Sequence, residues 1–218
     1  MSKAVLFDLD GTLLDTAPDL RRALNEVLAD HGRAPLSLAA VRPHATHGTK
    51  SLLTLAFGEG AFERQALREA FWAAYLRDIA LETRLFQGVA ELIATLDGAG
   101  IPWGIVTNKV THLTEAALPN YTELAACAAL VCGDTLAERK PHPSPLLHAA
   151  RQLGVAPEHC LYLGDAVTDM EAARDAGMTG LVASWGYVDD SHPKWPAQAV
   201  LAHPVQLLDW CENGQLAG

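Results

Sequence analysis

Residues 4–15 read AVLFDLDGTLLD, and this stretch decides the fold. Positions 5–7 are consecutively apolar, which predicts a strand buried on both faces of a parallel sheet. Side chains alternate along a strand, so Asp8 and Asp10 are expected to point roughly the same way. Two adjacent carboxylates repel each other unless a cation lies between them, and Mg²⁺ prefers such oxygen ligands. The stretch therefore predicts a buried strand with an acidic, metal-binding end; the alternative is an ordinary surface Asp-x-Asp pair.

The composition allows a large core and argues against two classes of partner. Half of the 218 residues are apolar and 19% are charged, so the chain can form one large domain or a core with a smaller insertion. The formal net charge is −10, and no run rich in lysine or arginine occurs. Nucleic acid and anionic membranes are therefore not expected as standing partners.

The amino terminus and the cysteines are typical of a cytoplasmic protein. One lysine precedes the first strand without a long apolar segment, so no signal peptide is expected. The longest apolar run, residues 124–132, is too short to span a membrane. The four cysteines have no C-x-x-C spacing, which favours reduced thiols. We expect a cytoplasmic monomer or weak homodimer.

Residues 16–85 are predicted to form a small helical bundle inserted after the first strand. Pro18 suits a first helical turn, with Asp15 or Thr16 as the expected cap. The helices are expected at residues 18–30, 38–42, 50–57 and 61–79. The packed face of the last one is expected to follow Phe62, Ala66, Ala70, Ala73 and then Leu76 or Arg77 at successive turns.

From residue 86 onward, predicted strands and helices alternate. The strands are expected at residues 103–108, 129–134, 160–165, 179–183 and 199–201. The helices are expected at residues 89–96, 110–118, 144–153, 168–176 and 204–211. Alternation predicts a doubly wound (Rossmann-like) parallel α/β sheet, which binds ligands at the carboxyl ends of its strands. We therefore predict an α/β core of residues 1–15 and 86–218 with an α-helical cap of residues 16–85.

Four groups of polar residues fall at this predicted edge of the sheet. They are Asp8 with Asp10, Thr107 with Asn108, Lys140, and Asp165 with Asp169. The amides of the helix that follows residue 108 favour a phosphate. Lys140 stands in a loop stiffened by two prolines, KPHP at 140–143.

In this order, the four groups resemble the motifs of the haloacid dehalogenase superfamily, specifically its phosphatases with a helical cap. The matching segments are DLDGT at 8–12, Thr107, Lys140 and GDAVTD at 164–169. The resemblance covers essentially the whole chain. Phosphoglycolate phosphatases look most similar, and N-acetylmuramic acid 6-phosphate phosphatases share the same features, among them TNK at 107–109 and WGY at 185–187.

The resemblance implies Mg²⁺ as the cofactor and an aspartate as the nucleophile. Mg²⁺ would be held by the carboxylates of Asp8 and Asp165 and by the backbone carbonyl of Asp10. Asp8 would attack phosphorus to form an aspartyl-phosphate. Asp10 would protonate the leaving alkoxide and then activate water.

The resemblance also implies a set of groups that bind the phosphoryl oxygens. Thr107, Asn108 and Lys140 would hold these oxygens in the transition state. Asp169 would support the metal site from outside its ligand set, or hold Lys140. The duller alternatives are a helix cap for Thr107, a solvated surface position for Lys140, and a helix N-terminal carboxylate for Asp169.

The predicted cap contains one conspicuously polar segment, RPHATHGTK at residues 42–50. In the resembled family the cap closes over the active site and contacts the substrate beyond its phosphate. We therefore predict that Arg42, His47 or Lys50 contacts a carboxylate or hydroxyl of a small phosphorylated metabolite. The alternative is an ordinary polar loop between helices.

Asp10 favours a phosphatase over a dehalogenase, because a halide leaving group needs no proton. A phosphonate hydrolase is weakly supported, since Lys50 is the only lysine in the predicted cap. The sequence thus predicts a magnesium-dependent phosphomonoesterase similar to phosphoglycolate phosphatases. The alternatives are an N-acetylmuramic acid 6-phosphate phosphatase, a β-phosphoglucomutase-like phosphomutase and a non-catalytic binding module.

Overall fold

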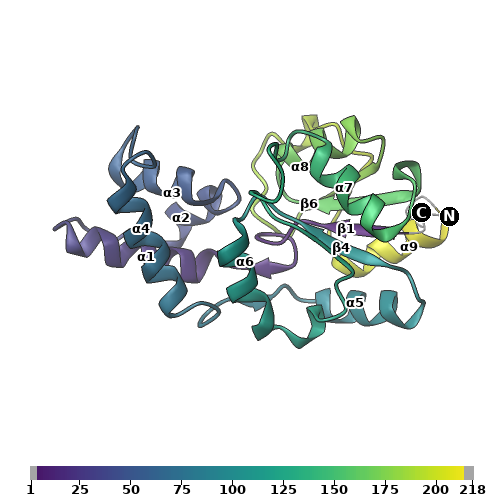
Figure 1. Ribbon diagram of the computed structural model, residues 1–218, viewed down its shortest axis with the longest axis horizontal. Helices are drawn as coiled ribbons and strands as arrows, with labels where there is room; N and C mark the ends of the chain where they lie inside the picture. Colours follow the sequence, from purple (N-terminus) through teal and green to yellow (C-terminus); the bar gives the residue numbers. More distant parts are fainter. Residues whose placement is uncertain (1–3, 214–218) are drawn as a thin grey trace.

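A six-stranded parallel sheet forms the centre of the molecule (Figure 1). The computed structural model describes residues 4–213. The strands are β1 (Ala4–Phe7), β4 (Trp103–Val106), β5 (Ala129–Val131), β6 (Cys160–Gly164), β7 (Thr179–Ala183) and β8 (Ala199–Leu201). They follow the order β5-β4-β1-β6-β7-β8, and each neighbouring pair is parallel. The residues after β1 therefore reach the middle of the carboxyl edge.

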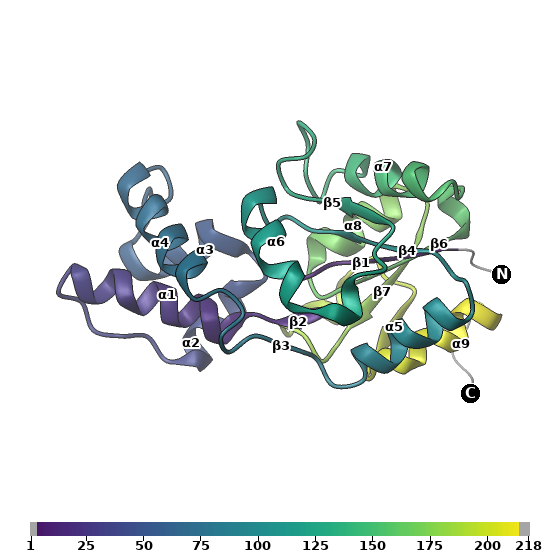
Figure 2. The same cartoon turned by 60° about the horizontal axis from the view of Figure 1, so that its bottom comes forward.

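Helices cover both faces of this sheet, as Figure 2 shows. The four that pack on it are α5 (Val89–Gly98), α7 (Ser144–Leu153), α8 (Val167–Asp175) and α9 (Leu207–Asn213). Because side chains alternate along a strand, Val5 and Phe7 of β1 pack toward α5 and α9, whereas Leu6 packs toward α7 and α8. The predicted doubly wound α/β fold is confirmed.

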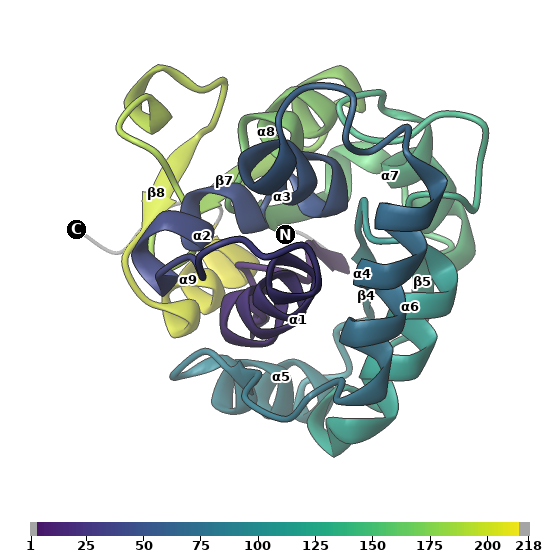
Figure 3. The same ribbon diagram turned by 90° about the vertical axis from the view of Figure 1, so that its left-hand side faces the viewer.

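Four further helices form a bundle beside the carboxyl edge of the sheet (Figures 1 and 3). They are α1 (Ala17–Asp30), α2 (Leu38–Ala45), α3 (Gly48–Phe57) and α4 (Gln65–Arg77). Their buried apolar residues, among them Leu24, Leu53 and Phe71, form a cluster of their own. The chain enters and leaves through two short antiparallel strands, β2 (Leu14–Asp15) and β3 (Arg84–Leu85). These crossings support the proposed cap of residues 16–85.

The predicted packed face of α4, the last cap helix, is wrong by one position. Ala66, Ala70 and Ala73 are exposed. The buried residues of α4 are Leu67, Phe71, Ala74 and Tyr75. The larger side chains remove more apolar area from water than the alanines do, so they set the rotation of the helix. The helix is also shorter than the predicted residues 61–79.

Several element ends differ from the prediction for local reasons. α1 starts at Ala17, and neither predicted cap side chain is used; the Ala17 amide instead donates to the hydroxyl of the distant Tyr187 at 2.9 Å. Pro119 has no backbone N–H to continue a helix, so α6 (Thr111–Ala117) gives way to short 3-10 turns. Those turns are η1 (Leu118–Asn120) and η2 (Thr122–Leu124). Further 3-10 turns lie elsewhere in the chain, namely η3 (Pro157–His159), η4 (His192–Lys194) and η5 (Pro204–Gln206).

Between residues 4 and 213, none of the helices combines the length and the apolar character that crossing a bilayer requires.

Candidate active site

Three buried carboxylates meet at the carboxyl edge of the sheet. Asp8 follows β1, Asp165 follows the adjacent strand β6, and Asp169 lies in the first turn of α8. The Asp8 amide donates to the Leu163 carbonyl at 2.9 Å, which continues the pairing of the two strands. Each aspartate offers a carboxylate oxygen, and these atoms lie within 4.8 Å of one another. The structure thus brings three of the predicted site residues together.

Asp165 is held by groups from two other segments. Its Oδ1 accepts a hydrogen bond from the Thr12 hydroxyl at 3.0 Å, and its Oδ2 accepts one from the Tyr187 amide at 2.9 Å. Gly11 has φ +87°, and a Cβ there would lie 2.2 Å from Asp165 Oδ2. Only glycine fits this turn, because it tolerates the left-handed conformation and leaves room for the carboxylate.

The electrostatics of this cluster fit a bound cation. Burial, reinforced by Asp169, outweighs the opposing effect of Lys140 and raises the pKa of Asp8 from 3.8 to about 6. Burial, together with the charges of Asp8 and Asp169, raises the pKa of Asp165 well above its ordinary value. Carboxylates that resist ionisation in this way gain most from a divalent ion, and all-oxygen ligands suit Mg²⁺. The donor set therefore fits the expected metal.

Lys140 is an interior residue that joins two of these aspartates. Its Nζ lies 2.9 Å from Asp8 Oδ1 and 2.7 Å from Asp169 Oδ1. It also donates to the Val106 carbonyl at 2.8 Å and to the Tyr162 hydroxyl at 2.7 Å. Burial alone would lower its pKa, but the charges of Asp169 and Asp8 raise it above 10.5. Lys140 is therefore a buried cation and does not occupy a solvated surface position.

Thr107 and Asn108 follow β4 and line the same pocket. Thr107 does not cap the next helix, because α6 begins at Thr111, whose amide is bound by the Asp134 carboxylate at 2.8 Å. Asn108 Nδ2 donates to the Lys140 carbonyl at 3.0 Å. Within residues 4–213, Asn108 Oδ1 is buried and has no hydrogen-bond partner. The Thr107 hydroxyl oxygen accepts a hydrogen bond from the Lys109 amide at 3.2 Å, which leaves its O–H donor for a ligand in the pocket.

Asp10 is paired with a lysine that sequence reasoning did not assign to the site. Lys109 Nζ lies 3.2 Å from both carboxylate oxygens of Asp10 and 3.0 Å from the Tyr75 hydroxyl. The only sequence signal was its place in the TNK run at 107–109. Lysines are mostly exposed, so a buried, paired lysine cannot be recognised from its letter alone.

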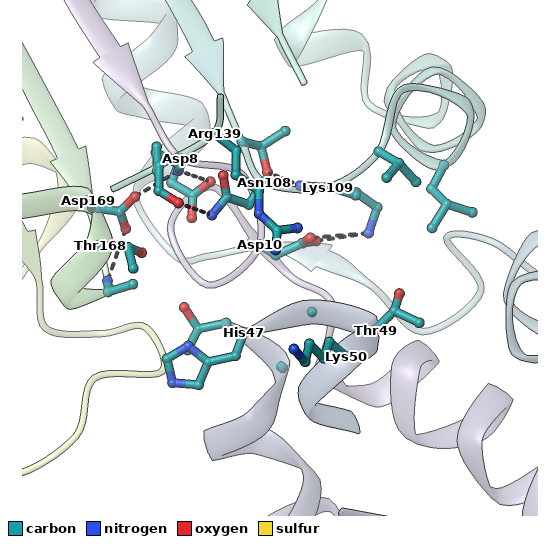
Figure 4. A pocket seen from close by; sticks show the side chains of 18 of the residues that line it. Asp8, Asp10, His47, Thr49, Lys50, Asn108, Lys109, Arg139, Thr168 and Asp169 are labelled. Atoms are coloured by element: carbon teal, nitrogen blue, oxygen red, sulfur yellow. Dashed lines mark hydrogen bonds and ion pairs between the residues drawn. The ribbon is translucent and has the colours of Figure 1, made fainter. Parts of the chain in front are cut away.

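Core and cap together enclose a pocket of about 340 Å³. Asp8, Asp10 and Asp169 lie on its core side, and His47, Thr49 and Lys50 face them from the cap (Figure 4). We call the core side, with its acidic cluster and Lys140, the floor, and residues 46–50 the rim.

Arg42 does not line this pocket. Its guanidinium pairs with Asp15 at 2.8 Å and lies 5.4 Å from the centroid of the Tyr187 ring. The Tyr187 hydroxyl also donates to Asp15 at 2.7 Å. Of the three predicted cap residues, the structure thus brings His47 and Lys50 to the pocket and places Arg42 where the chain enters the cap.

The chain is similar to known hydrolases over most of its length. The sequence model of the haloacid dehalogenase-like hydrolases matches residues 2–177. The chain belongs to this family. The predicted resemblance is therefore confirmed.

Proteins similar to this hydrolase include two kinds of phosphatase. It is 45% identical over 210 residues to the phosphoglycolate phosphatase of Xanthomonas campestris pv. campestris (strain 8004), with 95% of each chain covered. It is 37% identical over 211 residues to the N-acetylmuramic acid 6-phosphate phosphatase of Pseudomonas aeruginosa, covering 95% of this chain and 93% of the relative. The predicted enzyme class, a phosphatase, is confirmed.

A solved structure supports the same assignment for the fold. The crystal structure of a predicted phosphoglycolate phosphatase from Haemophilus somnus 129PT has a TM-score of 0.84 and 26% sequence identity. The match covers 95% of this hydrolase and 96% of that chain.

Proposed function

We propose that this hydrolase is a magnesium-dependent phosphomonoesterase for a small phosphorylated carboxylic acid, with phosphoglycolate as the first candidate. The observation that carries the proposal is the position of Asp8. Its carboxylate belongs to the acidic cluster, is paired with Lys140 and opens onto the pocket. A nucleophile for phosphoryl transfer needs this combination of a cation site, a charged partner and access to the substrate.

The carboxylates of Asp8 and Asp165 and the backbone carbonyl of Asp10 would hold Mg²⁺. When bound, the ion supplies positive charge that neutralises the carboxylates and the phosphate. Asp169 Oδ1 pairs with the Lys140 cation at 2.7 Å, and its Oδ2 accepts from the Ala166 amide at 3.0 Å. By contrast, within the described part of the chain, Asp165 accepts only from a neutral hydroxyl and a neutral amide. These contacts support a role in which Asp169 holds Lys140 instead of binding the metal directly.

The reaction follows from the residues around the pocket. An Asp8 oxygen attacks phosphorus in line, a bond from Asp8 to phosphorus forms, and the bond to the leaving oxygen breaks. Asp10 gives a proton to that oxygen. Asp10 then takes a proton from the water that attacks the aspartyl-phosphate, which releases phosphate and frees Asp8. Thr107 and Asn108 hold the phosphoryl oxygens through both steps. Lys140, whose donors reach Asp8, Asp169 and the Val106 carbonyl, stabilises the negative charge of these oxygens through its positive charge.

The residues of the rim favour a substrate that carries a carboxylate. α3 begins at Gly48, so its first amides have no intrahelical partners, and this turn lines the pocket. A helix N-terminus favours an anion, and the exposed Lys50 and His47 add donors beside it. The volume of about 340 Å³ lies at the small end of ligand pockets, which span about 300–1,000 Å³. Both features suit a small acid.

N-acetylmuramic acid 6-phosphate is the second candidate, because one relative is named as a phosphatase for it at 37% identity. Its lactyl group also carries a carboxylate, so the same rim residues serve either substrate. Its sugar ring needs more room beneath the cap than phosphoglycolate does.

The test compares phosphate release, as kcat/KM with Mg²⁺, from three esters: 2-phosphoglycolate, N-acetylmuramic acid 6-phosphate and ethyl phosphate. The proposal predicts the highest value for phosphoglycolate and loss of activity with EDTA, restored by Mg²⁺. A strong preference for the amino sugar ester would move the assignment to the second candidate. Equally low values on all three would reject both substrates. Turnover that needs a bisphosphate activator and releases little phosphate would indicate a phosphomutase.

We also propose a cytoplasmic location and a monomer or weak homodimer. All four cysteines are free thiols, which is typical of a reducing compartment. Light scattering over a range of protein concentrations tests the oligomeric state, and a stable higher oligomer would contradict the proposal.

A further inference from the structure

The ammonium group of Lys109 has each of its three N–H donors engaged. An ammonium group has three donors and no acceptor. Two contacts go to the carboxylate oxygens of Asp10 at 3.2 Å each, and the third goes to the Tyr75 hydroxyl at 3.0 Å. The Lys109 side chain is 5% exposed and its charge lies 4.6 Å from the centroid of the Tyr75 ring. No donor of Lys109 is left for a phosphoryl oxygen or a carboxylate of the substrate.

These contacts join the core to the cap. Lys109 belongs to the core, immediately after Thr107 and Asn108, whereas Tyr75 belongs to cap helix α4. Tyr75 is buried and stacks on Phe71 with 8° between the rings. Next to it, Trp72 of α4 packs edge-on against His112 of α6, with ring centroids 4.9 Å apart. The Tyr75 hydroxyl is therefore placed on Lys109 by the packing of α4 against the core.

We propose that Lys109 is a positioning residue for Asp10, and that the cap completes this arrangement through the Tyr75 hydroxyl. The inference rests on the proposed role of Asp10 as the acid and base of the reaction. Because Lys109 contacts both Asp10 oxygens at the same distance, one contact survives when the other oxygen carries a proton. When α4 moves away, Lys109 loses a buried partner and Asp10 loses its fixed orientation. Proton transfer is then most effective with the cap in place.

A leaving-group comparison separates this role from substrate binding. Ethyl phosphate has a poor leaving group that needs the Asp10 proton, whereas p-nitrophenyl phosphate releases a stable anion that does not. Neither ester has a carboxylate that the rim could bind. The value of kcat/KM reports the steps up to the transfer of the phosphoryl group to Asp8, so it excludes the later hydrolysis.

Lys109→Met is expected to lower kcat/KM for ethyl phosphate about 10²-fold, the scale of general acid catalysis, and to change the value for p-nitrophenyl phosphate less than about 5-fold. Tyr75→Phe removes only the hydroxyl and is expected to lower the ethyl ester value about 5-fold, on the scale of one hydrogen bond. Lys109→Arg should recover part of the loss, since it restores a cation. Lys194→Met, at an exposed lysine, is the matched control and should behave like wild type.

Equal losses on both esters would overturn the inference, because Lys109 would then act on the phosphoryl group or on the fold. A further large loss when Lys109→Met is added to Asp10→Asn would also overturn it, since residues acting through one another are not additive. If Lys109→Met does not fold by circular dichroism, Tyr75→Phe decides by the same comparison of esters. If the wild-type enzyme hydrolyses the two test esters but not phosphoglycolate, the proposed substrate is rejected. The two test esters still decide the role of Lys109.

Discussion

The floor and the rim of the pocket differ in how strongly their polar groups are tied to one another. In the floor, Asp8, Lys140 and Asp169 are buried and lie within 2.7–2.9 Å of a charged neighbour. In the rim, His47 and Lys50 are exposed at the start of a helix. A change in the floor therefore disturbs several groups together, whereas a change in the rim is local. This contrast explains how one reaction can be retained while the substrate differs between relatives.

The largest expected effect is that of Asp8→Asn, which removes the nucleophile from the floor. We expect kcat to fall by about 10⁴-fold or more, as for other enzymes that lose their nucleophile. Asparagine has nearly the same shape and carries no charge to bury, so the protein should remain folded by circular dichroism. A variant that keeps most of its activity would contradict the role of Asp8.

Gly11→Ala tests whether the floor is sensitive to small displacements. The added Cβ would lie 2.2 Å from Asp165 Oδ2, so Asp165 must move, and a shift of about 1 Å can cost about 10²-fold in rate. Gly58→Ala is the matched control, because Gly58 has the same φ of +87° but no atom within 4 Å of its Cβ position. Both variants should lose stability through backbone strain, but only Gly11→Ala should lose kcat. Equal activities would show that Asp165 is not rigidly held.

Mg²⁺ should stabilise the floor more at pH 7.5 than at pH 5. Because the pKa of Asp8 is about 6 in the folded chain against 3.8 ordinarily, the metal-free folded protein binds more protons than the unfolded chain between these values. Its unfolding free energy therefore falls as the pH rises through this range, by about 3 kcal/mol for this group. At pH 5 protons compete with the metal.

Thermal melts with and without Mg²⁺ at the two pH values measure this effect. The Mg²⁺-induced rise in Tm should be several degrees larger at pH 7.5, and Lys50→Ala in the rim should leave the difference unchanged. The same rise at both pH values would contradict a metal bound by these carboxylates.

The smallest expected effect belongs to the rim. Lys50→Ala should raise KM for phosphoglycolate about 10-fold, equivalent to about 1.4 kcal/mol of binding, with little change in kcat. Its kcat/KM for p-nitrophenyl phosphate, which has no carboxylate, should stay within about 2-fold of wild type. The exposed Lys194 supplies the control Lys194→Ala. An unchanged KM for phosphoglycolate would mean that Lys50 does not contact its carboxylate.

The sequence predicted the meeting of Asp8 and Asp165 in the floor because both residues stand at the ends of strands. Once β1 and β6 are recognised as buried parallel strands, Asp8 and Asp165 must meet at the same edge. This inference needs only the run of apolar residues that marks each buried strand and the position of each carboxylate after its strand.

The contacts between distant segments were not predictable in this way. Arg42 meets Asp15 because of how the cap is placed on the core, and Lys109 meets Asp10 because the segments after β4 and β1 lie side by side at the sheet edge. Likewise, the apolar face of α4 depends on which side of the helix meets α1, and alanines fit either side. Such choices depend on tertiary packing, which local patterns do not contain.

The most direct test of the account is to trap the covalent intermediate. The enzyme is mixed with Mg²⁺ and p-nitrophenyl phosphate and quenched in acid during turnover, and its peptides are mapped by mass spectrometry. The account predicts one acid-stable, base-labile phosphoryl group on Asp8, absent from Asp8→Asn. Turnover with no phosphorylated peptide in any quenched sample, or with the phosphoryl group on another residue, would contradict it.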